Sequence, residues 1–567
     1  MRWGDLIIDS GKEWYLPEQI LRGRVLYRDL AWLYGPFVPY WNALLLWVGG
    51  VHLHSLVASG ILSIVLTVLP LHFLGRRLLG EGLAGLTVAT FLCVLAFGFY
   101  ISPHNYDYIL PYTYAATYGM AFALWTLLFF ARILEGEQDG PWAILALTLT
   151  ALTRWELAAA LAFSILLAAW DPAQRGKGPN RFRSALSFLL PSLGITVILY
   201  VLFFVLLVRG QGWTWEAIRT HLSPTSPFAR SLMGLDLLRD NLLGLAVTLG
   251  LYAVFALFFF AGGRAAAGLR IETGQARSWG PVLVIAAVVA VPVALILENL
   301  FGPQAQFRCV PLICLYLAWG TLKRGRPDPK DNLWLATSLF AFLSLGRILL
   351  KASPEQYGFT LLVPGLLVYY GFFLKDLPGR FPEGRIRLFV KGGFLLVSGL
   401  FLAGHVGIAS GWYAKCTFPV ETPRGTLMCF PTEPAPGCAK LLQFLREDSQ
   451  AGDSLAVFPE GAALNFLSGL PNPLTDYVCN PVDLMPSGAP KRVIDQLEAN
   501  KVTYVVLLQR DTGEYGPASF GRDYAKDIMG YVFAHYSPIQ QWGPFPYVTQ
   551  FFGMVLLKRH SDQVIVR

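Results

Sequence analysis

Apolar segments separated by short polar connections fill the first part of the chain, up to about residue 410. Segments of about 18 or more apolar residues are long enough to cross a hydrocarbon layer of roughly 30 Å as α-helices. A helix also satisfies its own backbone hydrogen bonds in lipid. The pattern therefore predicts a polytopic α-helical membrane domain. The expected spans are residues 51–74, 83–101, 118–134, 143–170, 184–208, 241–261, 281–297, 309–322, 333–350, 359–374 and 388–411.

One of these spans, residues 143–170, carries Thr153, Arg154, Trp155 and Glu156 at its centre. An Arg and a Glu in the middle of one lipid-buried helix would be costly. Two half-length helices that meet at the outward side avoid this cost. With them we expect about twelve crossings or half-crossings and both chain ends outside.

The basic residues divide the connections into two sets. By the positive-inside rule, the connections rich in Lys and Arg face the cytoplasm. The other set has fewer basic residues and more Tyr, Trp, Asn and Pro, so we expect it to face outward and to carry the function. The basic set lies around residues 76–77, 132, 175–183, 264–277, 323–330 and 375–387, and the outward set at 104–117, 209–239, 298–308 and 351–357.

This assignment places the first 35 residues outside, although no apolar segment precedes them in the printed sequence. Either the charge reading is off by one crossing, or a first transmembrane helix is missing from this chain, for example through a start site placed too late. We favour the second explanation as an expectation.

The composition changes to that of a soluble domain from about residue 412. Helical periodicity at 438–449 and 490–500 alternates with β-like runs at 454–458, 502–509 and 552–558. We therefore expect a C-terminal extracytoplasmic α/β domain. The predicted division is a first extracytoplasmic loop with interfacial helices at 1–50, a transmembrane helical domain at 51–411 and the α/β domain at 412–567.

Four cysteines lie in the predicted C-terminal domain: Cys416, Cys429, Cys438 and Cys479. An even number of cysteines in an oxidising compartment is compatible with one or two disulfides. Reduced, buried thiols are the alternative, and the sequence does not decide between them.

Composition supports the membrane class. The chain of 567 residues is 54% hydrophobic and only 14% charged, and its mean hydropathy is +0.48. These values exclude an ordinary soluble globular protein. The net charge of +8 comes from short basic clusters between apolar spans, so it indicates membrane topology and not a nucleic-acid partner.

The first outward loop holds three acids among aromatic residues: Asp5, Asp9 and Glu13. A partly desolvated carboxylate gains basicity, so one of them could act as a general base on a hydroxyl. Composition alone favours the alternative, that they are solvated loop charges or helix caps.

This loop resembles the first extracytoplasmic loop of the GT-C superfamily of membrane glycosyltransferases, in particular bacterial proteins similar to protein O-mannosyltransferases and lipid A aminoarabinose transferases. In that family an acid precedes a Leu-x-Gly-x-x-x-Tyr-Arg-Asp element and a Tyr/Asn-Gly-Pro end. Here Asp9 matches the acid, 21–23 with 27–29 match the element, and 34–36 match its end. The family normally has a transmembrane helix before this loop.

The resemblance continues along the chain. Residues 153–156 resemble a Thr-Lys/Arg-Pro-Glu break between two short helices, with Trp155 in place of the usual Pro. Residues 357–359 resemble the end of a late His-Tyr-Gly-Phe segment, with Gln356 where His is common. The apolar series and the terminal domain match in order, so the resemblance covers nearly the whole chain.

The resemblance implies an inverting transfer of a sugar from a polyprenyl-phosphate donor to a hydroxyl on a glycan, lipid or protein acceptor at the outer membrane face. Asp9 is the expected base. Cations must stabilise the leaving phosphate. Arg154 and Lys351 stand at the family-like positions, and the resemblance places Glu156 and Tyr357 in the same substrate-binding set.

Two further cations are open to two interpretations. Arg308 either binds phosphate or pairs with Glu298. Arg347 either binds phosphate or extends its charge from a helix end to the membrane surface.

The second outward loop adds His104 and Asp107 as candidates for the site. Asp107 is a second catalytic candidate that orients the acceptor or binds a divalent ion, while His104 is more typical of a loop than of a metal ligand. No cluster has metal-ligand spacing, so the sequence indicates no certain cofactor and leaves a divalent metal possible. The sequence contains no Walker-type element, which argues against nucleotide-driven transport.

The alternative to a transferase is a non-catalytic carrier or flippase of lipid-linked saccharides. A flippase needs charges along a central pathway, whereas here they gather at outward helix ends. We therefore expect an enzyme of the bacterial inner membrane, in contact with membrane lipid. The sequence does not name the sugar, the lipid or the acceptor.

Overall fold

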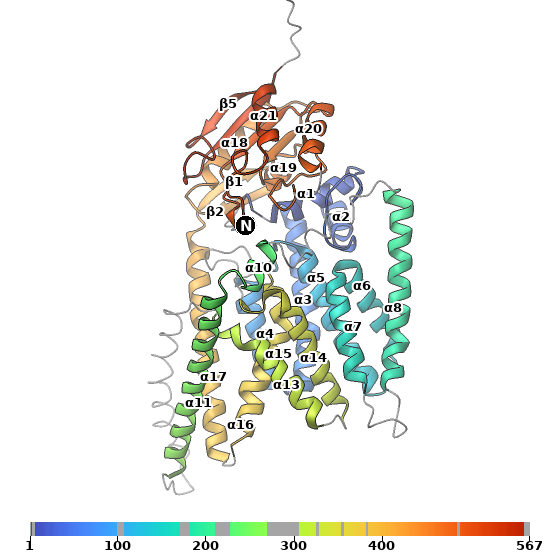
Figure 1. The fold of residues 1–567 in the computed structure, drawn as a ribbon, viewed down its shortest axis with the longest axis vertical. Coiled ribbons are helices and arrows are strands. Elements are labelled where there is room, and N and C mark those ends of the chain that lie inside the picture. The colour runs from blue at the N-terminus through green and yellow to red at the C-terminus, as the bar shows by residue number, and fades with distance from the viewer. Residues whose placement is uncertain are drawn as a thin grey trace, which may run out of the picture.

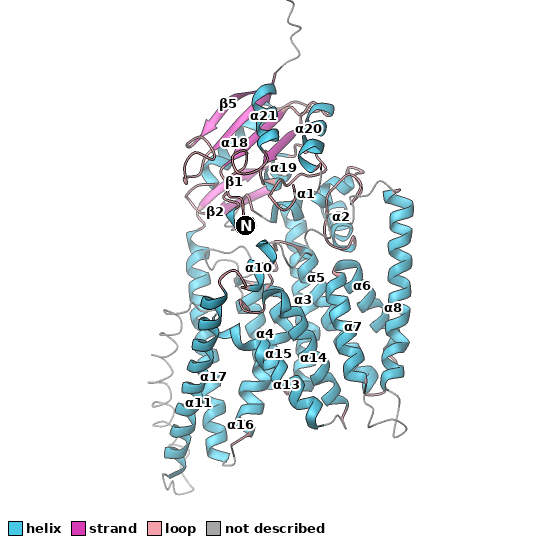
Figure 2. Cartoon of the chain, viewed as in Figure 1, coloured by secondary structure: helices cyan, strands magenta, loops and turns pink. Residues whose placement is uncertain are grey.

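The computed structural model describes residues 2, 6–8, 10–98, 107–170, 181–209, 227–268, 305–324, 328–352, 357–381, 384–484 and 488–560. A bundle of long helices forms one part of the molecule, and a smaller α/β domain sits on one end of it (Figure 1). Among the described residues, every strand belongs to the α/β domain (Figure 2). The predicted fold class, a polytopic helical membrane protein with a C-terminal α/β domain, is confirmed.

Six described helical segments are long and apolar enough to cross a membrane. They are Leu53–Leu78, Tyr114–Leu134, Arg181–Val208, Ala229–Arg264, Phe359–Gly379 and Gly384–Lys415. The predicted span 281–297 lies outside the described residues. The helices of the bundle are α3 (Leu53–Leu78), α4 (Glu81–Thr90), α5 (Tyr114–Leu134), α6 (Gly140–Thr153), α7 (Trp155–Ala169), α8 (Arg181–Phe203), α10 (Pro227–Met233), α11 (Leu238–Gly268), α13 (Val310–Arg324), α14 (Pro329–Leu345), α15 (Val363–Gly371), α16 (Leu377–Gly379) and α17 (Gly384–Lys415).

The segment 143–170 forms two short helices, as its central charges predict. Helix α6 ends at Thr153 and α7 begins at Trp155. Arg154 between them has an extended backbone, with φ −145° and ψ 96°. Because the helix is interrupted at Arg154, its side chain does not follow the helical geometry. In a continuous helix at this position, the charge would be exposed to lipid.

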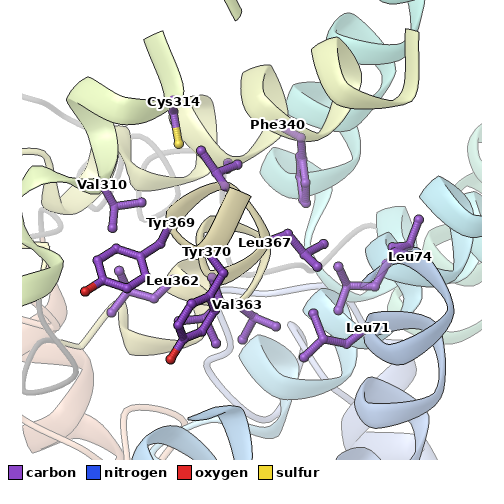
Figure 3. Packing of buried hydrophobic residues seen from close by; sticks show 14 of the residues in the cluster. Leu71, Leu74, Val310, Cys314, Phe340, Leu362, Val363, Leu367, Tyr369 and Tyr370 are labelled. Carbon is purple, nitrogen blue, oxygen red and sulfur yellow. The ribbon is translucent and has the colours of Figure 1, made fainter. Parts of the chain in front are cut away.

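Helix α15 is the centre of the bundle core (Figure 3). Its side chains Leu367, Tyr369 and Tyr370 are each at most 4% exposed. They pack with Leu71 of α3 and Phe340 of α14 in one cluster. Helices α8 and α11 instead leave most of their apolar faces uncovered, as expected for helices that contact lipid.

The C-terminal domain is a four-stranded sheet in the order β3-β4-β6-β5, preceded by the hairpin β1-β2. Strands β3 and β4 are parallel, while β6 runs antiparallel to both β4 and β5. Its elements are β1 (Phe418–Thr422), β2 (Gly425–Cys429), α18 (Ala435–Asp448), β3 (Leu455–Phe458), α19 (Ala462–Ser468), α20 (Ala489–Ala499), β4 (Tyr504–Leu508), α21 (Lys526–His535), β5 (Tyr536–Trp542) and β6 (Met554–Arg559). The three predicted strands and two predicted helices correspond to β3, β4, β6, α18 and α20.

The N-terminal segment joins this domain to the bundle. Helix α1 (Ser10–Leu21) packs so closely on α19 that a Cβ on Gly11 would lie 2.2 Å from the Ala463 nitrogen. The buried Glu18 of α1 is 2.5 Å from the Arg424 guanidinium in the β1–β2 turn. Helix α2 (Phe37–Gly49) follows, with Trp47 72% exposed. Domain and bundle are therefore tied together through the first 50 residues.

The four cysteines of the domain are buried free thiols. Of the two alternatives that the sequence leaves open, the structure has reduced cysteine.

Candidate functional site

A pocket lies at the junction between the α/β domain and the bundle. Its cavity volume is about 80 Å³. The walls come from α1, from the loop that precedes α2, from the segments after β3 and β4, and from the loop between α19 and α20. The lining residues are Lys12, Ala31, Trp32, Leu33, Tyr34, Glu460, Asp476, Tyr477, Val478, Asn480, Asp483 and Tyr515.

The domain wall of the pocket is built at the carboxyl ends of the parallel strands β3 and β4. Glu460 follows β3 and Arg510 follows β4, and Arg510 Nε lies 3.6 Å from Glu460 Oε2. Asn480 Nδ2 donates to the same carboxylate at 3.2 Å. Burial lowers the pKa of the Arg510 guanidinium, but the carboxylates of Glu460 and Glu514 outweigh it and raise that pKa. Arg510 therefore stays charged.

Two aspartates in this wall hold protons more tightly than usual. Desolvation raises the pKa of the half-buried Asp483 to about 7, and the charges of Glu460 and Asp476 raise it further against the effect of Lys12. Burial also raises the pKa of Asp476, although Arg492 is 2.7 Å from it. Carboxyl and amide groups beside aromatic faces suit a ligand rich in hydroxyl groups.

The bundle wall of the site is built on the α6–α7 break. The Arg154 side chain is 2% exposed, and its nitrogens lie 2.6 and 2.5 Å from Glu156 Oε1. Its guanidinium also lies 4.8 Å from the ring centroid of Tyr34, which lines the pocket. Tyr34 thus connects the pocket to the buried cation.

Gly35 explains how the loop reaches the break. Its N–H donates to the Thr153 carbonyl at 3.0 Å. A Cβ at Gly35 would lie only 1.9 Å from the Leu152 carbonyl oxygen. Glycine is therefore required for this approach, which accounts for the Tyr-Gly-Pro sequence at 34–36 in physical terms.

Three more side chains gather beside Arg154. Tyr112 and Tyr357 meet edge to face, with ring centroids 5.5 Å apart. The charge of Arg347, an exposed residue after α14, acts on both Tyr112 and Glu156. The charges of Arg154 and Lys12 act on Tyr112 as well. The charges of two arginines and one lysine therefore favour the ionised form of Tyr112.

The structure places the other predicted cations differently. Lys351 lies 3.4 Å from Asp236, beyond α10, and the preceding residue donates its N–H to Met233. Arg308 packs against α11, where a Cβ on Gly244 would lie 2.2 Å from its Nη1. Its Nε is buried without a hydrogen-bond partner among the described residues. Arg347 is thus the cation whose charge reaches Glu156 beside Arg154.

Asp107 occupies a turn. It is 3% exposed, and its Oδ1 accepts from the N–H groups of Ile109 and Leu110 at 3.0 and 2.9 Å. Burial raises its pKa to about 7. The turn touches α1, because Ser10 Oγ donates to the Leu110 carbonyl at 3.2 Å.

Two predicted site residues, Asp9 and His104, lie outside the described residues. Within the part of the chain that the structure describes, no group of three His, Cys, Asp or Glu residues could hold a metal ion.

Of the domain wall, the sequence indicated only the turn at 458–461, which holds Glu460 and which ligand binding and turn chemistry both explain. Glu460, Asp483 and Arg510 lie far from the first loop in sequence, and only the fold brings them together. For Glu460 and Arg510 the available signal was their position directly after strands, where parallel sheets place ligand sites. Asp483 lies between α19 and α20 and carries no such signal.

Protein-family models and curated proteins give no match to this chain. Among solved structures, the fold is similar to that of the archaeal oligosaccharyltransferase AglB from Archaeoglobus fulgidus in complex with an inhibitory peptide and a dolichol-phosphate, with TM-score 0.46, 14% identity and coverage of 100% of this chain and 72% of that chain. The apo oligosaccharyltransferase of the same organism has a TM-score of 0.49 and 13% identity, and the match covers 100% of this chain and 72% of that chain. ArnT from Cupriavidus metallidurans bound to undecaprenyl phosphate has a TM-score of 0.40 and 13% identity, and the match covers 98% of this chain and 94% of that chain. All three TM-scores lie below 0.5, so the function proposed below rests on the residues of this chain.

Proposed function

We propose that this protein is an inverting membrane glycosyltransferase that moves a sugar from a polyprenyl-phosphate donor to an acceptor hydroxyl at the outer face of a bacterial inner membrane. The observation that carries the proposal is Arg154, a buried cation at a helix break, in contact with a loop whose sequence resembles the GT-C superfamily. A buried Arg is expensive to maintain in a membrane protein and marks a functional site.

Arg154 and Arg347 suit the donor phosphate. In the transfer, the acceptor oxygen attacks the anomeric carbon, and the bond from that carbon to the phosphate oxygen breaks with its electron pair going to the phosphate. Cations fixed beside the leaving oxygen stabilise the charge that develops there. Glu156 holds the Arg154 guanidinium in place, since both contacts are at 2.6 Å or less.

The acceptor needs a base and a binding surface. Asp9 is the proposed base, on the basis of the motif match, and takes the proton of the acceptor hydroxyl. The pocket supplies carboxylates that accept hydrogen bonds from the acceptor. Tyr34 lies between this pocket and Arg154, so an acceptor in the pocket would lie next to the donor phosphate.

Lys351, Arg308, Tyr357, Asp107 and His104 remain proposed members of the substrate-binding region. The Lys351–Asp236 contact at 3.4 Å suits a structural ion pair as well, and a variant at Lys351 separates the two roles. Asp107 is proposed to act on the acceptor through the turn that contacts α1.

The test is transfer by the purified full-length protein in nanodiscs with a panel of polyprenyl-phosphate sugars, read out as release of the lipid phosphate. We expect release from at least one donor in the presence of a polyol or glycan acceptor, and loss of release in Asp9→Asn. Movement of intact lipid-linked sugar across proteoliposomes, without release from any donor, would instead establish a carrier.

A further inference from the structure

The connection between β5 and β6, residues 543–553, carries exposed apolar side chains. Phe545 is 36% exposed, Val548 73% and Phe551 77%. The sequence from Tyr536 to Leu557 contains no charged residue. Soluble domains rarely present such a stretch to water, and its presence on a surface marks an interaction site.

Strand pairing places this connection at the end of the sheet that faces the bundle. Met554, the first residue of β6, pairs with both Leu508 at the end of β4 and Trp542 at the end of β5. The connection therefore lies at the same sheet end as the pocket. That end faces the bundle, because the turn Gly513–Tyr515, which follows β4, contacts α10.

The connection also extends sideways, beyond the pocket. Strand β5 is the edge strand at the far side of the sheet from β3, and Figure 1 shows β5 on the same side of the view as α17. Helix α17 ends near the domain with Trp412 and the 44% exposed Tyr413. Trp and Tyr at the end of a membrane helix mark the level of the lipid headgroups.

Contacts within the domain link residues 543–553 to the level of the lipid headgroups. Phe430, just after β2, packs edge to face on Trp412 with ring centroids 5.8 Å apart. Seven residues on, at the start of α18, a Cβ on Gly437 would lie 3.4 Å from the Phe552 ring. Phe552 thus anchors the connection to the segment that leaves the headgroup level.

We propose that residues 543–553 contact the lipid surface on the domain side of the membrane, with Phe545, Val548 and Phe551 in the interface. Apolar and aromatic side chains without charge suit the boundary between headgroups and acyl chains. This contact holds the α/β domain over the junction site from the side opposite to α1. It is independent of the proposed transferase activity.

The test uses the full-length protein in nanodiscs of phosphatidylcholine and phosphatidylglycerol. A nitroxide is attached to Val548→Cys and Phe551→Cys, and to a control, Gln450→Cys. Gln450 is exposed and precedes β3, at the opposite end of the sheet. Collisions with oxygen, which concentrates in lipid, are compared with collisions with a water-soluble nickel chelate. Unmutated protein taken through the labelling gives the background from native thiols.

We expect a ratio of oxygen to nickel collisions that is severalfold higher at 548 and 551 than at 450. Equal ratios at the three sites would overturn the proposal, because the connection would then face water. Low collision rates with both reagents at 548 and 551 would overturn it too, because protein, for example a second copy of the chain, would then cover the connection.

Discussion

Arg154 combines a charge with almost complete burial, and this defines the chemistry of the site at the residue scale. The sequence predicted both the residue and the helix break, because a charge inside an apolar run has few structural solutions. Its partner Tyr34 was also within the recognised motif. The sequence could not predict that the charge of Arg347 reaches Glu156, which lies beside Arg154. This proximity depends on the packing of α14 against α7.

Substitution of Arg154 tests the donor site. Arg154→Ala should lower the rate of lipid-phosphate release about 100-fold or more, since loss of one charge-stabilising donor typically costs this much. Arg154→Lys should restore little, because an ammonium cannot reproduce the planar contacts to Glu156 and Tyr34. The matched control is Arg77→Ala. Arg77 lies in the last turn of α3, and the substitution breaks its 3.0 Å pair with Glu135. Equal loss in both variants would mean that Arg154 is only structural.

Asp483 predicts a pH dependence of stability. Its native pKa of about 7 lies above its ordinary value of 3.8. Between these values the native state keeps a proton that the unfolded chain has lost, so stability falls as pH rises through this window. Asp483→Asn should therefore raise the unfolding temperature at pH 8, by an amount set by ~1.4 kcal/mol per pKa unit, and should change it little near pH 4. A variant that melts below the wild type at pH 8 would refute this interpretation of Asp483.

At the scale of elements, periodicity predicted most of the described spans within a few residues, because the lipid requirement for about 20 apolar residues is strict. The exception is Ala229–Arg264, which begins well before the predicted span 241–261. It missed β5, whose interior reads Ser-Pro-Ile-Gln-Gln. An edge strand exposed on both faces shows no alternation, and Pro538 argues against a strand. It also missed the short helix α19, on which α1 packs.

The close contact of the first loop with the α6–α7 break gives a prediction for Gly35. Gly35→Ala should reduce lipid-phosphate release strongly and lower the unfolding temperature, because its Cβ would overlap the Leu152 carbonyl. Gly320→Ala in α13 is the control, since a Cβ there meets nothing within 4 Å and Ala favours a helix. Wild-type activity in Gly35→Ala would show that the loop does not need this approach.

The contact between α1 and the β1–β2 turn can be tested in the same way. The Glu18 side chain is 4% exposed and that of Arg424 19%, so Glu18→Ala leaves a largely buried cation. We expect a loss of about 3 kcal/mol, near the lower end for a broken buried pair, seen as earlier thermal unfolding. Lys558→Ala, which breaks an exposed pair with Asp448 at 3.3 Å, should cost at most ~1 kcal/mol. Similar losses in the two variants would contradict the role of Glu18.

At the scale of the whole molecule, the α/β domain and the first 50 residues close over the end of the bundle that carries Arg154. Both the first 50 residues and the α/β domain contribute walls to the pocket, so it forms where the two meet. For this reason the sequence could predict the membrane class and the candidate residues of the bundle wall, but not how the domain wall meets them, because Glu460, Asp483 and Arg510 lie far from α1 in the chain. Attachment of the domain on two sides, by α1 and by the proposed lipid contact of residues 543–553, would keep the junction in register.

The most direct test of the account is a cryo-electron microscopy structure of the full-length protein in a nanodisc with bound polyprenyl phosphate. The account predicts density for the phosphate within hydrogen-bonding distance of the Arg154 guanidinium, on the side that faces Tyr34 and the pocket. Phosphate density elsewhere, with Arg154 still held by Glu156 alone, would contradict it.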